Sequence, residues 1–293
     1  MKIKHRTALL LFVLTSTLLF GQNSAVFDNN KTLLFKVTKE NSNKETYLFG
    51  THHALGKSFF DSLPIANEAL ESSEIAIFES LNIPGQMFPD IVSKRTTTTD
   101  WEKYFNKEDY TFIKALLQNS NTDYTKMTPT EMYTFLNRHH KQYICKKRAE
   151  GDTSFTLDDY IVSRAKDFNL KVIGLETTAD QIKWINQDVE GMPRRTHKKR
   201  LSYAVNRIRT KDTSSCQEIN WFTSLNIDLQ LDKPCLNSLM FTDRNARWME
   251  KIKSLIETNN CFIAVGFSHY WYECGLINQL MNLGYKIEPV QLK

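Results

Sequence analysis

The alternation of short apolar segments with amphipathic helical ones most constrains the fold of this 293-residue chain. Residues 45–50 and 74–79 have strand composition, and residues 63–71 between them, with Pro64 in a first-turn position, have helix composition. Such a strand, helix and strand within about thirty-five residues is typical of a βαβ unit, whose strands are parallel. Four further strand candidates occupy residues 31–38, 170–175, 261–266 and 285–290.

Helical periodicity fills most of the intervals between these strands, in residues 157–168, 178–189, 197–209, 240–258 and 271–283. Residues 84–150 change character, because Tyr, Phe, Leu and Lys recur there at helical spacing. We therefore predict an α/β fold with a mostly parallel or mixed central sheet flanked by helices. A helical cap is expected as an insertion at about residues 84–155 within a single domain spanning 26–293.

The N-terminus has the pattern of a secretory signal peptide, predicted over residues 1–21. Basic residues precede an apolar run over residues 8–20, which is shorter than the roughly 20 residues of a membrane-spanning helix. We expect a secreted or periplasmic protein with no stable membrane insertion after cleavage. The formal charge of +5 falls to about +2 without the three basic residues of this segment, which does not favour a nucleic-acid partner.

Five cysteines are compatible with disulfides in an exported protein. Cys216 and Cys235 bracket one short segment and are the expected pair, while an odd count leaves at least one thiol outside an intramolecular bond. Cys261 opens an apolar strand and is interpreted as a buried packing residue.

Two strand candidates end in the same pattern, a glycine followed after two residues by a histidine. The first is Tyr47–His53 and the second is Ile263–His269. Glycine at a strand end allows a sharp turn and a close approach of the backbone to a ligand. Because ligands of open parallel sheets bind at the carboxyl ends of the strands, His53 and His269 are predicted at that edge.

Two glutamates follow the other parallel strands at the same edge. Glu79 ends the strand at 74–79, and Glu176 follows the strand at 170–175. Two imidazoles and one or two carboxylates can hold a catalytic metal ion, or act without metal as a general acid and base. Alternatively the histidines are satisfied by backbone groups, and the glutamates cap helices or occupy their first turns.

Three ordered blocks of this sequence resemble the TraB/GumN family and together cover about 130 residues. They are GTHHALGKSFFDSLPIANEALESSEIAIFES, LDDYIVSRAKDFNLKVIGLETTADQ, and the C-terminal block from DRNARWMEKI to GYKIEPV. The resemblance implies a fold shared with the Tiki metal-dependent proteases, and a more distant relation to erythromycin-esterase-like hydrolases and a haem-binding lipoprotein group. It also implies that His53, Glu79 and His269 are essential, and it matches Asp158, Glu176, Gln181 and Arg244 to family positions.

One departure from the family pattern concerns the second motif. His269 is followed by Tyr270, Trp271 and Tyr272, where the family has Leu, a small residue and Gly. The aromatic run either narrows the pocket or packs the cap, which leaves the substrate class open. Arg244 is expected to orient Glu79 or Glu176 through a bidentate contact, or to bind a substrate carboxylate or oxyanion.

These observations favour a metal-dependent hydrolase, and among hydrolases a peptidase, acting on a peptide or small-molecule substrate. His53, Glu79 and His269 would bind a Zn, Mn or Co ion, and Glu176 or Glu79 would activate water. The alternatives are a non-catalytic protein that binds haem, metal or a peptide, and a metal-independent esterase-like hydrolase with a His/Glu pair. The basic run over residues 194–200 is interpreted as a solvated helix face.

Overall fold

The computed structural model describes residues 32–81, 87–145, 156–225 and 227–292. A six-stranded mixed sheet lies at its centre, in the order β4-β3-β5-β2-β1-β6. The strands are β1 (Leu34–Thr38), β2 (Thr46–Thr51), β3 (Ile75–Phe78), β4 (Lys171–Gly174), β5 (Cys261–Gly266) and β6 (Lys286–Val290). This arrangement confirms the predicted α/β fold.

Parallel pairing joins the four strands that matter for the site. β5 pairs in parallel with β2 on one side and β3 on the other, and β4 extends the row beyond β3. β1 is antiparallel to both β2 and β6. The central strands β3 and β5 are almost entirely apolar because helices cover both faces of the sheet.

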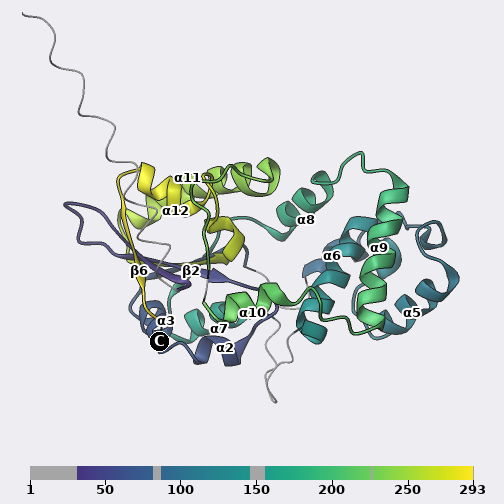
Figure 1. Cartoon of the computed structure of the whole chain (residues 1–293). Helices are drawn as coiled ribbons and strands as arrows, with labels where there is room; N and C mark the ends of the chain where they lie inside the picture. Colours follow the sequence, from purple (N-terminus) through teal and green to yellow (C-terminus); the bar gives the residue numbers. More distant parts are fainter. Residues whose placement is uncertain (1–31, 82–86, 146–155, 226, 293) are drawn as a thin grey trace, which may run out of the picture.

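Helices form a layer on each side of the sheet (Figure 1). α11 (Arg244–Ile256) and α12 (Leu276–Asn282) cover one face. The other face carries α2 (Lys57–Asp61), α3 (Pro64–Glu71), α7 (Leu157–Asp167) and α10 (Gln217–Thr223). One continuous apolar core, which includes Leu48, Ile77, Ile161, Phe262 and Ile252, joins the three layers.

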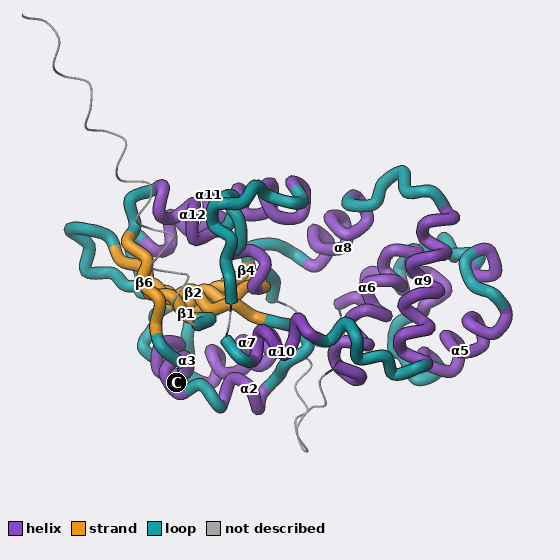
Figure 2. Tube along the Cα trace, viewed as in Figure 1, coloured by secondary structure: helices purple, strands orange, loops and turns teal. Residues whose placement is uncertain are grey.

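A second lobe consists of helices and loops, as Figure 2 shows, and has a separate apolar core. Its elements include α4 (Met87–Ser93), η1 (Trp101–Lys103), α5 (Lys107–Leu117), η2 (Tyr124–Lys126), α6 (Pro129–His140), η3 (Lys141–Cys145) and α9 (Arg194–Arg209). Trp101 and Met132 pack in this core together with Leu201 and Val205 of α9. The lobe therefore combines the expected helical insertion with a helix from much later in the chain. α8 (Thr178–Gln187) lies between the lobes.

Some helix boundaries differ from those predicted. α2 and α10 were not expected. A π-helical turn, η4 (Ser238–Asp243), precedes α11, and a 3₁₀ turn, η5 (Phe267–Tyr270), follows β5. The helix expected from residue 271 begins only at Leu276, because Gly275 lies against the carbonyls of Tyr270 and Trp271 in an extended conformation.

The predicted signal peptide lies outside the described residues. Within the part of the chain that is described, no helix combines the length and apolarity needed to cross a membrane.

The disulfides correct the pairing expected from sequence. Cys145 is bonded to Cys216 and Cys235 to Cys274, across 71 and 39 residues respectively, while Cys261 is a buried free thiol. Nearness in sequence did not predict the pairs, because the two cysteines lie in different parts of the fold. Cys216 immediately precedes α10 and is beside Cys145 at the end of η3, whereas Cys235 is beside the segment that follows η5.

Candidate functional site

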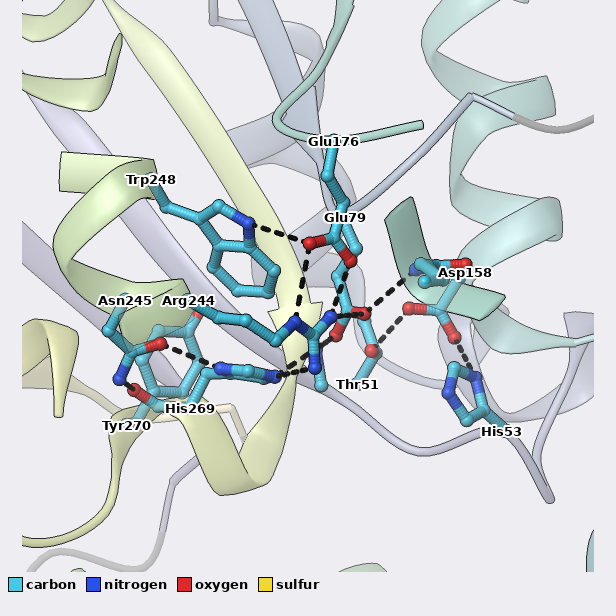
Figure 3. A network of polar contacts seen from close by, with 12 residues as sticks. Thr51, His53, Glu79, Asp158, Glu176, Arg244, Asn245, Trp248, His269 and Tyr270 are labelled. Atoms are coloured by element: carbon cyan, nitrogen blue, oxygen red, sulfur yellow. Dashed lines mark hydrogen bonds and ion pairs between the residues drawn. The ribbon is translucent and has the colours of Figure 1, made fainter. Parts of the chain in front are cut away.

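The carboxyl ends of the four parallel strands bring the predicted residues together (Figure 3). Thr51 ends β2 and pairs with Gly266 at the end of β5, while Phe78 of β3 pairs with Gly174 of β4. Glu79 and Glu176 follow β3 and β4, and the Glu176 N–H donates to the Glu79 carbonyl at 2.8 Å. Segments more than two hundred residues apart in sequence therefore meet at one edge of the sheet.

The two motif glycines are required for space. Neither has a positive φ, which among described glycines occurs at Gly191 and Gly284. A Cβ on Gly266 would lie 2.7 Å from Glu79 Oε1, the atom that accepts the Gly266 N–H at the same distance. A Cβ on Gly50 would overlap the ring of Phe267. Gly266 thus allows the carboxylate of Glu79 to approach the backbone.

His269 is held in a closed environment. Asn245 donates through Nδ2 to the carbonyls of His269 and Cys274, which leaves its Oδ1 to accept from His269 Nδ1 at 2.7 Å. The proton of a neutral ring therefore lies on Nδ1, and Nε2 carries the lone pair. The ring of Trp248 lies 4.3 Å away, centroid to centroid, and the side chain is only 4% exposed.

Arg244 connects His269 to both glutamates. Its Nε and Nη2 contact the two oxygens of Glu176 at 3.2 and 2.5 Å, Nη2 also contacts Glu79 Oε2 at 3.3 Å, and Nη1 lies 3.3 Å from His269 Nε2. Trp248 Nε1 donates to Glu176 at 3.2 Å, and Gln181 reaches Glu79 at 3.4 Å. Arg244 and Glu176 are each 7% exposed, so the pair is a buried bidentate one.

His53 lies at the open side of the same edge, with its side chain 44% exposed. Its Nδ1 lies 2.9 Å from Asp158 Oδ2, and the Thr51 hydroxyl donates to the other oxygen of Asp158. Asp158 stands in the first turn of α7 and ties the first Gly-x-x-His turn to that helix. The carboxylate orients the ring with Nδ1 toward Asp158 and Nε2 away from it.

The two histidines have opposite pKa shifts. Burial, reinforced by the charge of Arg244, lowers the pKa of His269 to about 3. For His53, desolvation alone would lower the pKa, but the charge and hydrogen bond of Asp158 outweigh it and raise the pKa. Desolvation would raise the pKa of Glu79, yet the positive charge of the Arg244 guanidinium lowers it, so Glu79 is ionised at neutral pH.

The residues predicted as metal ligands fit a divalent ion in donor type and ring orientation. Both imidazoles are held through Nδ1, which is the arrangement that outer partners give to metal-binding histidines. Three carboxylates, Glu79, Asp158 and Glu176, share this edge with the Arg244 guanidinium, and a divalent cation would offset part of their negative charge.

Two of the three predicted ligands lie close together, and His53 lies farther away. His269 Nε2 is 3.9 Å from Glu79 Oε1, but His53 does not join them in a set whose ligand atoms all lie within 4.8 Å. Within the described residues that spacing occurs at His140, Cys145 and Cys216, where the sulfurs form a disulfide.

Some contributors were not identified as site residues from sequence. Asp158 was matched to a family position without a role, and Thr51, Asn245 and Trp248 were not singled out for chemistry. Asp158 stands two residues after a helix-capping threonine, so its pattern resembles an ordinary first-turn carboxylate. Only the tertiary structure, in which Thr51 and His53 both contact Asp158, shows that this carboxylate faces His53.

The fold and the site together define an α/β protein with a polar centre built by two Gly-x-x-His turns at the carboxyl edge of a mixed sheet. The model of the TraB/PrgY/gumN family matches residues 33–289, and the chain belongs to this family. No curated protein and no solved structure shows significant similarity to the chain.

Proposed function

We propose that the chain is a hydrolase, acting on peptide substrates, in which His53, Glu79 and His269 hold a divalent metal ion. The observation that carries this proposal is the fixing of both imidazoles through Nδ1, by Asp158 at 2.9 Å and by Asn245 at 2.7 Å. Each neutral ring then presents an Nε2 lone pair, and the ionised Glu79 lies beside one of them. A Zn, Mn or Co ion would supply Lewis acidity and lower the pKa of a water molecule.

The remaining groups have separate tasks in this proposal. Asp158 orients His53, and Asn245 orients His269. Glu176, expected from sequence as a general base, has both oxygens engaged by Arg244 and one also by Trp248, so its contacts favour a positioning role. Arg244, held by Glu176, has its guanidinium at the edge where a substrate oxygen would develop negative charge.

A second candidate is hydrolysis without metal, with His53 as the general base. The observation that favours it is the His53–Asp158 pair, in which a carboxylate orients a half-exposed imidazole. Arg244 Nη1, only 3.3 Å from His269 Nε2, already occupies the side of the ring that a metal would need. In this candidate Glu79 and Arg244 bind and polarise the substrate.

Metal content and chelation separate the two candidates. Purified protein is analysed for bound metal and assayed on peptide and ester libraries before and after exhaustive chelation, with readdition of Zn, Mn or Co. The metal proposal predicts loss of turnover on chelation, its return on readdition, and no metal binding in His53→Ala or Glu79→Gln. His139→Ala, in the helical lobe, is the matched control that retains both properties.

Other outcomes decide against the metal. Full activity after chelation, abolished in His53→Ala, would support the metal-free candidate. Absence of turnover on every substrate, together with a Soret band on haem titration that disappears in His269→Ala, would replace the hydrolase with a binding protein.

A further inference from the structure

The outer face of α9 carries an unbalanced group of cations. Arg194, Arg195, Lys198 and Lys199 are all exposed, and their side chains form no ion pair with the described residues. The ion pairs of this helix are those of Arg209 at its far end, with Glu108 and Asp109. Four adjacent positive charges therefore face solvent without an ion-pair partner among the described residues.

The placement of these charges is locally unfavourable. Arg194 and Lys198, and likewise Arg195 and Lys199, are like-charged pairs at i and i+4, which destabilise a helix. They also occupy its N-terminal turns, where the backbone already presents partial positive charge and where α9 has no acidic residue. Alanine, glutamate or glutamine at the same positions would form a better helix, so folding does not account for these residues.

The C-terminal half of α9 is committed to the helical lobe. Leu201, Ala204, Val205 and Ile208 are buried in its core against α6. The helix cannot roll to insert these apolar side chains elsewhere, so the surface that it leaves exposed includes the cations of its N-terminal half. One turn beyond Lys199, Tyr203 is 55% exposed.

We propose that this cationic face of α9, defined by Arg194, Arg195, Lys198, Lys199 and Tyr203, docks the protein on a bilayer surface rich in anionic phospholipid. Charge complementarity carries the proposal, since clustered lysines and arginines are attracted to anionic headgroups. Exposed side chains along a single helix form no groove that would enclose a polymer chain, and tyrosine is enriched at membrane–water interfaces. α9 lies on the far side of the helical lobe from the sheet, so docking through α9 leaves the sheet lobe away from the bilayer (Figure 1).

Cosedimentation with vesicles tests the docking surface. The full chain is mixed with vesicles of phosphatidylcholine alone and of phosphatidylcholine with phosphatidylglycerol. The apolar N-terminal segment would bind both, so the readout is the difference between them. Wild type should prefer the anionic vesicles, and Lys198→Ala/Lys199→Ala should lose about 25-fold in that preference. Higher salt should weaken it further.

The matched control is Lys166→Ala/Lys253→Ala, which removes two exposed cations from the sheet lobe. It should keep the wild-type preference, and circular dichroism should show all variants folded. Equal binding to both vesicle types, or an equal loss in the control, would overturn the proposal. Binding of wild type to a soluble polyanion such as polyphosphate, without a preference for anionic vesicles, would overturn the proposal in favour of a polymer ligand.

Discussion

The two Gly-x-x-His turns share a sequence pattern but have different surroundings. His269 is 4% exposed, bonds an amide and lies against Trp248, whereas His53 is 44% exposed and bonds a carboxylate. The former follows β5, which has parallel neighbours on both sides and lies beneath α11. The latter follows β2, whose other neighbour is antiparallel.

The difference shows that strand position determines the chemistry available to an identical motif. A turn after a central strand is enclosed, so burial lowers the pKa of His269 to about 3 and keeps its ring neutral. A turn nearer the open side keeps its imidazole accessible, and Asp158 raises the pKa of His53. We infer that the His269 turn gives the centre an imidazole that stays neutral, and that the His53 turn responds to pH and substrate.

Replacing Arg244 should cause the largest loss of stability, because this residue holds the buried network around His269 together. Arg244→Ala would leave Glu79 and Glu176 as uncompensated buried charges, and we expect a loss of about 3–5 kcal/mol in the free energy of unfolding. Denaturant unfolding measures it. Arg247→Ala, which removes a neighbouring arginine stacked on Trp184, should cost less than about 1 kcal/mol. Similar losses in both variants would contradict the buried network.

On the His53 side, a substitution should change activity more than stability. Asp158→Asn keeps the shape but removes the charge that raises the pKa of His53, so turnover should fall about 10²–10⁴-fold. Because less of the ring would be protonated at a given pH, the acidic limb of the pH–rate profile should move to lower pH. Asp159→Asn, the adjacent residue on α7, is the control. An unchanged acidic limb in Asp158→Asn would show that Asp158 does not set the pKa of His53.

Titration of the two histidines in the metal-free protein should give the smallest change in stability, and it compares the two turns most directly. NMR should show His53 titrating above pH 6.5 and His269 staying neutral until about pH 3. The His53–Asp158 pair then stabilises the fold fully below pH 6.5 and less as pH rises through its folded pKa. His269 does the reverse, so its contribution is lost as pH falls from 6.5 toward 3. If both histidines titrated at the same pH, the proposed difference between the two turns would be wrong.

Sequence periodicity was sufficient to predict the strands and the α/β class, because burial of alternate or continuous apolar residues is a local property. The ends of β3 and β4 likewise placed Glu79 and Glu176 at the edge where parallel strands finish. The same reasoning could not foresee η4 or the late start of α12, since these depend on contacts of residues distant in sequence, such as the carbonyls beside Gly275.

What the sequence determined by itself was therefore the set of elements and the two histidine turns that end them. The tertiary structure decided that Asp158 faces one imidazole and Asn245 the other, that α9 joins the helical lobe, and that Cys145 bonds Cys216. The physical reason is that a hydrogen bond, a pKa or a disulfide depends on which side chains meet in space. Those partners come here from α7, α11 and η3, none of which is adjacent in sequence to the group that it contacts.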